Sequence, residues 1–506
     1  MQPSTKSFVR FHQRRVSNGL LLETVETPAL ILPTYLGNLL YSPPSLAKET
    51  ILENDGPIIG QLELGDVVDR SFGNVSLHDL QKDITCTDPT ESGSWRDFTA
   101  NKFNGACITH AASKSLQTSK ELGHGVQGLV HLVSGRSVRD GPALCTDTGA
   151  SIITPGGRRV LTSTAYAQRI ALDRPHVVVS FADEFPLSCT SKNRMARSVK
   201  RTMSMLQELV TSFKSDAIKT PSILFGVALA GQHMDALSFN SKAVLAAGAQ
   251  GVSVGCVNQG EDEGAFATAV RTVRDATLES TYSALENIKP ESVPVLVQGC
   301  DNLRTLLIAL EQGVDLVGSN LSALLTGVGH ALTIDWEFVD SEVKTSLRFE
   351  HNTQSLDGGF GSSAVNKGTQ STDAAPETPP TKKRRISAVI DLWDNVYQID
   401  PHAIMGQRGG ENAMCPCHAC RYHSRAYIHH LLQAKELLWE VLLSLHNQAQ
   451  LLKMFRHARQ HAMAGTLSEW IAVLHSTYDL TDLDWHALQS RNAALHASKG
   501  AILSDD

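Results

Sequence analysis

The chain has 506 residues, a formal net charge of −7 and 42 % hydrophobic residues. This composition is ordinary for a soluble globular protein, and the length offers ample apolar material for a large core. No run of about 18 uncharged apolar residues is present, so we expect no membrane-spanning helix. The first 15 residues lack the apolar stretch of a secretory signal. The net acidity argues mildly against a protein whose main task is binding nucleic acid, because phosphate binding needs a positive surface.

Short apolar runs alternate with helical patterns between residues 28 and 332. Eight runs rich in branched residues predict strands at residues 29–33, 58–62, 143–145, 177–181, 223–227, 251–255, 293–297 and 314–317. Helical patterns occupy residues 194–213, 241–247, 264–287 and 302–312. This alternation predicts an α/β protein with a parallel sheet buried on both faces, and eight strands close a (β/α)₈ TIM barrel. A doubly wound open sheet is the competing architecture, but the chain contains no dinucleotide-binding fingerprint.

The chain divides into three parts by composition. We expect residues 1–350 to form the barrel body, with an irregular insertion at about residues 62–141. Residues 352–385 are dominated by Gly, Ser, Thr and Pro and end in a basic run, so we expect a disordered low-complexity insert. The basic run fits a nuclear-import signal or an RNA tether, although a solvated charge run is the simpler interpretation. Residues 388–506 should form a helical subdomain that completes the barrel surface.

Three of the nine cysteines, Cys415, Cys417 and Cys420, lie within six residues, while the other six are scattered singly. This pattern favours a reducing compartment and a metal site over a disulfide framework. With His446, the cluster makes a complete ligand set for one Zn²⁺. Four protein ligands leave no place for an activated water, so the ion should be structural. The rival fourth ligands are His418, His423, His429 and His430, of which His423 is credible by spacing alone.

If His446 is the fourth ligand, the chain must reverse direction between it and Cys420. The two residues are 26 positions apart, and one straight helix of that length would separate them by about 39 Å. We expect the turn at residues 433–436. His446 would then lie on a second helix that runs back, and the ion would fasten a helical hairpin to the loop before it.

Residues 424–432 and the pair His446-Asn447 resemble the zinc segment of the tRNA-guanine transglycosylases. The resemblance extends over most of the chain, from residue 27 through the C-terminal helices, and selects His446 as the fourth ligand. It implies the barrel fold with a zinc-binding helical subdomain.

Two motifs in the barrel region carry the resemblance to the family's substrate pocket. The run TDTG at residues 146–149 resembles the family motif Thr-Asp-Ser-Gly-Gly, whose Asp serves in substrate recognition and acid/base work. The run FADE at residues 181–184 is similar to Phe-Asp-Glu, whose Asp binds the pyrimidine edge of the base, but one residue is inserted. The resemblance therefore marks Asp147 and Asp183 as pocket remnants. A turn-capping role is an equally good interpretation of Asp147.

The family's nucleophilic carboxylate has no counterpart. It belongs to the motif Asp-x-Phe-Asp-(Cys/Ser)-x-x-Pro-Thr-Arg, and the matching run at residues 315–319 has Gly318 at its position and lacks the Pro-Thr-Arg. Asp315 corresponds to the earlier acid of that motif. Because side chains alternate along a strand, residue 315 faces away from residue 318 and cannot replace it. We therefore predict no catalytic residue in this chain.

A retained zinc segment beside a lost nucleophile resembles the non-catalytic accessory subunits of this family. The resemblance implies a heterodimer with a catalytic queuine tRNA-ribosyltransferase subunit that exchanges guanine for queuine at the wobble position of tRNAs with GUN anticodons. It also implies a cytoplasmic protein with peripheral association to the mitochondrial outer membrane. Two alternatives remain open: an active transglycosylase that acts alone through Asp147 or Asp183, and a zinc-stapled barrel that binds another partner.

The C-terminal region offers residues for both contacts. Its leucines predict either a dimer contact or packing on the chain's own barrel: Leu437, Leu438, Leu442, Leu443 and Leu451. Its cations give a local basic density that the net charge hides: Arg421, Arg425, Lys435, Lys453, Arg456 and Arg459. We expect Arg421 and Arg425 to contribute to tRNA binding.

Overall fold

The structure is a computed structural model that describes residues 27–35, 38–42, 46, 58–64, 129–137, 141–154, 157–173, 175, 177–185, 189–214, 223–229, 233–255, 262–284, 293–354, 385–406 and 415–480. Among these residues, eight parallel strands close into a barrel, because the first strand pairs with both the second and the last. In barrel order they are β1 (Ala29–Tyr35), β3 (Ile58–Glu63), β4 (Leu129–Ser134), β8 (Val177–Val179), β9 (Ile223–Ala228), β10 (Gly251–Val254), β11 (Val295–Gln298) and β12 (Leu316–Gly318). A short strand, β2 (Asn38–Leu39), pairs antiparallel with the end of β1.

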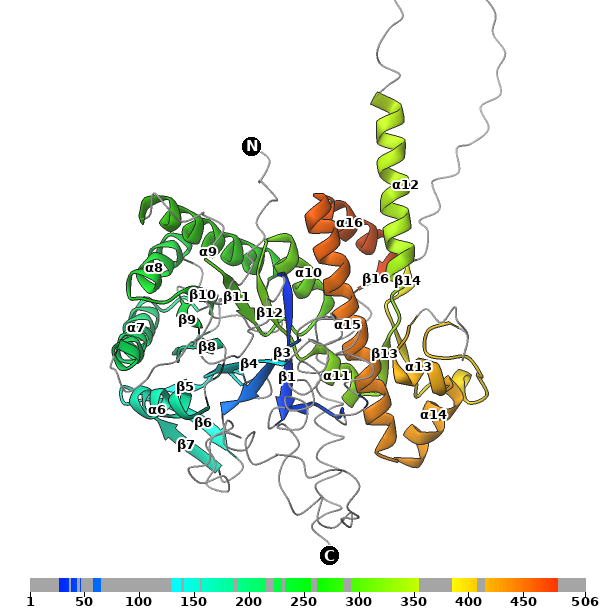
Figure 1. Ribbon diagram of the computed structural model, residues 1–506, viewed down its shortest axis with the longest axis horizontal. Coiled ribbons are helices and arrows are strands. Elements are labelled where there is room, and N and C mark those ends of the chain that lie inside the picture. Colours follow the sequence, from blue (N-terminus) through cyan, green and yellow to red (C-terminus); the bar gives the residue numbers. More distant parts are fainter. Residues whose placement is uncertain are drawn as a thin grey trace, which may run out of the picture.

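Helices follow the strands and surround the barrel (Figure 1). They are α6 (Ser163–Asp173), α7 (Lys192–Lys214), α8 (Met234–Ala246), α9 (Glu263–Ala284), α10 (Leu303–Glu311) and α11 (Leu321–Gly327). Every residue of β8, β10 and β11 is buried, as expected for strands with packed side chains inside the barrel and helices outside it. The predicted (β/α)₈ barrel is confirmed.

One of the eight predicted barrel strands is wrong. Residues Leu144–Cys145 form β5, which begins a three-stranded antiparallel sheet with β6 (Ala150–Thr154) and β7 (Gly157–Leu161). The barrel uses β4 instead, a strand inside the region that we predicted to be an irregular insertion. Leu144 is 63 % exposed, so this apolar residue is not part of the barrel core. Residues 65–128 lie outside the described part of the chain.

The C-terminal part begins with β13 (His330–Leu332) and α12 (Trp336–Gln354). It continues with β14 (Ile386–Ser387), β15 (Val389–Asp391), the 3₁₀ helix η4 (Asn395–Tyr397), α13 (His418–Tyr422), α14 (Arg425–Ala434), α15 (Leu438–Ala464), α16 (Leu467–Thr477) and β16 (Tyr478–Asp479). Helix α12 includes residues 352–354 of the predicted disordered insert. Residues 355–384 lie outside the described residues, so the rest of that expectation stays a prediction.

Helix α15 joins the appended subdomain to the barrel (Figure 1). It contacts α11, β1 and β13 as well as α13 and α14. Near its start, Ser444 Oγ and Gln448 Nε2 donate hydrogen bonds to the Leu40 carbonyl (2.7 and 3.1 Å). Near its end, Arg459 donates to the Pro28 carbonyl (3.0 Å). None of the described helices combines the length and apolar character needed to cross a membrane.

Candidate metal centre and barrel mouth

The structure brings Cys415, Cys417, Cys420 and His446 together. All four residues are buried, and their ligand atoms lie within 4.8 Å of one another. His446 Nδ1 lies 3.7, 3.5 and 3.4 Å from the Sγ atoms of Cys415, Cys417 and Cys420. A tetrahedral ion with Zn–S and Zn–N bonds of ordinary length places sulfur and nitrogen about 3.5 Å apart. The four residues therefore form a group that can hold one metal ion.

The surroundings of the cluster prepare both kinds of ligand. His446 Nε2 lies 2.8 Å from the Leu332 carbonyl, which accepts a hydrogen bond from Nε2–H and so leaves the Nδ1 lone pair facing the thiols. Hydrogen bonds from Cys417 and Cys420 hold the pKa of the Cys415 thiol well below its usual value. Cys417 also caps α13, because its sulfur accepts the Cys420 N–H (3.4 Å). A thiolate and an oriented imidazole are the forms that a metal ion requires.

The helical hairpin has its predicted turn. Helix α14 ends at Ala434, the following residue Lys435 adopts the left-handed conformation (φ 55°), and α15 begins at Leu438. Two of the rival histidines have other contacts: the His423 ring stacks on Tyr427 with centroids 5.1 Å apart, and His429 Nδ1 bonds to the Leu392 carbonyl (2.9 Å). Within the described chain, His446 is the histidine that joins the cysteine cluster.

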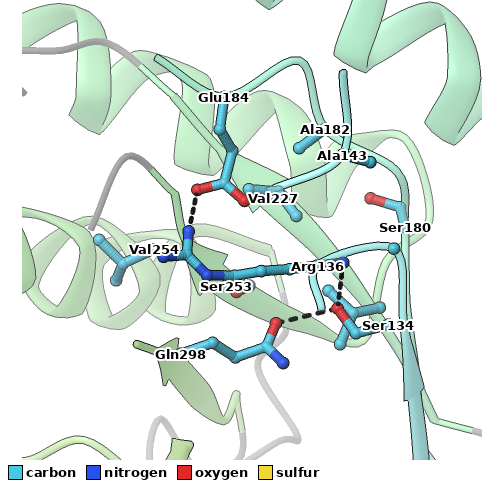
Figure 2. A pocket seen from close by; sticks show the side chains of 12 residues that line it. Ser134, Arg136, Ala143, Ser180, Ala182, Glu184, Val227, Ser253, Val254 and Gln298 are labelled. Atoms are coloured by element: carbon cyan, nitrogen blue, oxygen red, sulfur yellow. Dashed lines mark hydrogen bonds and ion pairs between the residues drawn. The ribbon is translucent and has the colours of Figure 1, made fainter. Parts of the chain in front are cut away.

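A second site lies at the carboxyl ends of the barrel strands, where barrel active sites form. The cavity there measures only about 10 Å³, the space of one water molecule. Arg136 and Glu184 face each other across it, with Arg136 Nη1 2.6 Å from Glu184 Oε2 (Figure 2). On the barrel side, Ser134 Oγ donates to Gln298 Oε1 (3.0 Å) and Gln298 Nε2 donates to Gln61 Oε1 (2.7 Å). These polar groups bond to one another inside the barrel.

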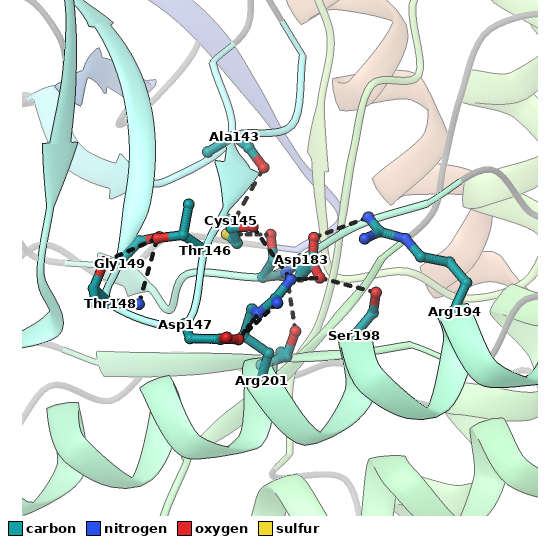
Figure 3. Close-up of polar contacts among 12 residues, drawn as sticks. Ala143, Cys145, Thr146, Asp147, Thr148, Gly149, Asp183, Arg194, Ser198 and Arg201 are labelled. Atoms are coloured by element: carbon teal, nitrogen blue, oxygen red, sulfur yellow. Dashed lines mark hydrogen bonds and ion pairs between the residues drawn. The ribbon is translucent and has the colours of Figure 1, made fainter.

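Asp183 is buried but does not line this cavity (Figure 3). Its carboxylate accepts hydrogen bonds from Arg194 (3.0 Å), Arg201 (2.7 Å) and Ser198 (2.9 Å), all on α7. The neighbouring Glu184 faces the cavity instead. Adjacent side chains of an extended segment point to opposite sides, so the one-residue insertion in this motif exchanges the two carboxylates. Sequence reasoning missed Glu184 for this reason, and it missed Arg136 because β4 was not recognised.

Asp147 lies at the turn between β5 and β6 (Figure 3), and it is not among the residues that line the cavity. The Thr146 N–H closes this turn on the Gly149 carbonyl (2.8 Å). The Asp147 side chain is 88 % exposed and accepts two hydrogen bonds from Arg201 (2.6 and 2.9 Å). Among the described residues, Thr146 makes the hydrogen bonds that hold this turn, and the Asp147 carboxylate pairs with Arg201. The pocket role of Asp147 stays a prediction.

Gly318 is the last residue of β12 and pairs with Ile31 and Gln298. A Cβ added at this position would lie 3.3 Å from Gln298 Cγ, so a side chain there requires a small shift of Gln298.

Asp315 is buried just before the other end of β12, where its carboxylate bonds to Arg274 (3.0 Å) and the Val295 N–H (2.8 Å). Burial raises the pKa of Asp315 and the charge of Arg274 opposes the rise. The structure does not bring Asp315 to the mouth of the barrel.

Comparison with known proteins identifies the family. A protein-family model described as queuine tRNA-ribosyltransferase matches residues 131–479, more than half of the chain. The chain belongs to the queuine tRNA-ribosyltransferase family. The queuine tRNA-ribosyltransferase accessory subunit 2 of Danio rerio is 29 % identical over 334 residues, which cover 65 % of this chain and 73 % of the relative. The protein of the same name from Homo sapiens is 26 % identical over 291 residues, 56 % of this chain and 62 % of the relative. A queuine tRNA-ribosyltransferase of a Roseiflexus strain is 48 % identical over 66 residues, 12 % of this chain and 16 % of the relative.

Only part of the predicted leucine surface is available to a partner. In this member of the queuine tRNA-ribosyltransferase family, Leu442, Leu443 and Leu451 are buried, so these three pack within their own chain. Leu437 and Leu438, at the tip of the helical hairpin, are 71 % and 38 % exposed.

The predicted basic surface is also smaller than expected. Arg425 is bound within its own chain, to Asp400 (3.1 Å) and the Ile404 carbonyl (2.9 Å). The expectation that it contacts tRNA stays a prediction. Lys453 pairs with Glu337 (2.6 Å), and Arg456 is partly buried. Arg421 and Lys435 are exposed.

Proposed function

We propose that this chain is the non-catalytic subunit of a heterodimeric queuine tRNA-ribosyltransferase. In this proposal it pairs with the catalytic subunit and holds tRNA while that subunit exchanges guanine for queuine at the wobble position of GUN-anticodon tRNAs. The observation that carries the proposal is the barrel mouth. Gly318 offers no nucleophile, and the one acid among the described residues that line the cavity, Glu184, is paired with Arg136. The complex would work in the cytoplasm, with peripheral attachment to the mitochondrial outer membrane.

In this proposal the metal is one structural Zn²⁺ held by Cys415, Cys417, Cys420 and His446. Three sulfurs and one imidazole nitrogen are a common zinc donor set, and four protein ligands exclude a reacting water. Bound Zn²⁺ would join the loop at Cys415 to α15 and so hold the hairpin of α14 and α15 against the barrel. Metal analysis of the purified chain should give one zinc per chain. A Cys420→Ser variant should lose it.

The hairpin tip is the proposed contact with the catalytic subunit. Leu437 and Leu438 expose apolar surface there, and apolar side chains at the centre of an interface supply much of its binding energy. The double change Leu437→Glu, Leu438→Glu should abolish co-purification with the catalytic subunit and leave the melting temperature unchanged. Met463 is 63 % exposed on α15, so Met463→Glu is a matched control that should keep the complex. If both variants lose the complex, or if neither does, the hairpin tip is not the specific contact with the catalytic subunit.

The first half of α7 is the proposed contact with RNA phosphates. Lys192, Arg197 and Lys200 are exposed there and form no ion pair within the described part of the chain. The helix has no acid before Glu208. It starts beside the carboxyl ends of the strands, so its cations lie on the same side of the barrel as the mouth. Exposed cations without acidic partners attract phosphate and release counterions on binding.

The test replaces these three cations by serine in the heterodimer. The variant should bind tRNA more weakly, and the slope of log affinity against log salt should fall by about 2. The control replaces three surface cations that are bonded to Glu279, Gln312 and Glu263, namely Lys242, Arg271 and Arg304. Both variants change the net charge equally, so equal effects would show that only total charge matters and would contradict the assignment to α7.

A further inference from the structure

The Arg136–Glu184 pair lies where the strands of the barrel end. Arg136 follows β4 by two residues, and Glu184 belongs to the segment after β8. Their side chains are only 12 % and 6 % exposed. Taking both charges out of water is costly, and a buried pair gains little net stability over apolar packing. The general need for stability therefore does not account for this pair.

The position of Arg136 is fixed from inside the barrel. Its backbone N–H donates to Ser134 Oγ (3.0 Å), and its carbonyl accepts from Gln61 Nε2 (2.7 Å). Figure 2 shows the side chain extending from there across the cavity to Glu184. The remaining space of about 10 Å³ admits one water and no heterocycle. Arg136 therefore closes the cavity.

The partner that Arg136 gives Glu184 has a specific chemistry. A guanidinium is planar and presents N–H donors side by side to a carboxylate. Guanine and 7-deazaguanine bases carry the same N–C–N arrangement, with the ring N1–H and the exocyclic amino group on one edge. Adenine lacks it, because its ring N1 accepts. Arg136 Nη1 donates to Glu184 Oε2 (2.6 Å), and the N–H groups of a guanine-type base could donate to the same carboxylate.

We propose that Arg136 occupies the place of a guanine-type base at the barrel mouth, and that Glu184 is the residue that would bind such a base in its absence. A second cavity of about 270 Å³ adjoins this one, because Ser134, Gly135 and Ala143 line both. In this proposal, removal of the Arg136 side chain frees the space beside Glu184 that the base would enter. The choice of a guanine-type base rests on the proposed function, whereas the closure by Arg136 does not.

The test measures binding of radiolabelled guanine to the full-length chain by equilibrium dialysis. The wild-type chain should bind no guanine up to its solubility limit. Arg136→Ala should bind it at least tenfold more tightly than the wild type and should not bind adenine. Arg136→Ala combined with Glu184→Gln should lose this binding, because the carboxylate is gone. Arg158 lines the neighbouring cavity, so Arg158→Ala is the control and should behave as the wild type.

Guanine binding by the wild-type chain would contradict the claim that Arg136 closes the cavity. This measurement does not depend on the folding of any variant. Failure of Arg136→Ala to bind guanine, with wild-type circular dichroism and melting, would overturn the assignment of Glu184. Arg136→Gln, which keeps most of the stem but shortens the side chain, provides a second variant with the same expectation. The proposed function is tested separately, by co-purification with the catalytic subunit. An accessory role does not require a base in this pocket, so it can hold even if the guanine-binding predictions fail.

Discussion

Replacement of Asn447 by alanine tests the connection between the metal centre and the barrel. Asn447 is fully buried on α15 next to His446. Its Oδ1 accepts the Leu332 N–H (3.0 Å), and its Nδ2 donates to the carbonyl of His330 (3.0 Å) and to Thr326 Oγ1 (3.2 Å). Alanine removes all three bonds and leaves a small void.

The expected cost follows from these contacts. Each buried hydrogen bond to the backbone is worth about 1–2 kcal/mol when one partner is removed, and the void adds about 1 kcal/mol. Asn447→Ala should therefore lower the free energy of unfolding by about 3–5 kcal/mol, a large part of the stability of most domains. Because the Leu332 carbonyl also orients His446, a looser β13 should weaken metal binding by about tenfold or more.

Urea denaturation followed by circular dichroism measures the stability, and competition with a chromophoric chelator measures the metal affinity. Gln460 is exposed on the same helix, so Gln460→Ala is the control and should stay within about 0.5 kcal/mol of the wild type. An Asn447→Ala protein within about 1 kcal/mol of the wild type, with unchanged metal affinity, would refute the reasoning.

Three further predictions concern the C-terminal region. Chelation of the metal should speed hydrogen exchange in residues 415–434 and leave the barrel strands unchanged; equal exchange with and without metal would argue against a structural ion. Arg425→Ala should destabilise the protein by about 1–3 kcal/mol, whereas Gln433→Ala, at an exposed position of the same helix, should leave the melting temperature unchanged; equal shifts would contradict a structural role for Arg425. Burial alone would raise the pKa of Asp340, but the hydrogen bonds and charges of His457 and His461 hold it well below its usual 3.8. Its stabilisation is therefore complete above about pH 4 and is lost as the pH falls further. Asp340→Asn should cost about 2 kcal/mol at pH 7 and progressively less below pH 4 in urea titrations; a constant cost would show that the charge is irrelevant.

The sequence predicted the barrel because its strands carry a local signal, but one strand was misassigned. A short apolar run bordered by turn residues looks the same in a barrel and in an antiparallel hairpin. Residues 143–145 have this pattern and belong to the hairpin, while β4 was hidden in a long irregular region. The pairing of β4 with β3 and β8 shows that β4, and not residues 143–145, is the barrel strand.

The metal centre and the barrel mouth differ in how far the sequence could lead. Three clustered cysteines are a local signal, whereas the choice of His446 depended on the resemblance because 25 residues lie between it and Cys420. The mouth was harder to predict. An inserted residue decides whether Asp183 or Glu184 faces the cavity, and the partner Arg136 comes from a distant strand. Such a pairing depends on side-chain direction in the folded chain, which spacing along the sequence does not record.

A base-exchange assay tests the central claim most directly. Radiolabelled guanine is offered to a GUN-anticodon tRNA with this chain alone, with the catalytic subunit alone, and with both. The account predicts no incorporation by this chain alone and full incorporation by the mixture, above that of the catalytic subunit alone. Incorporation by the isolated chain, or a covalent adduct between it and tRNA, would contradict the claim that Gly318 leaves it without a nucleophile.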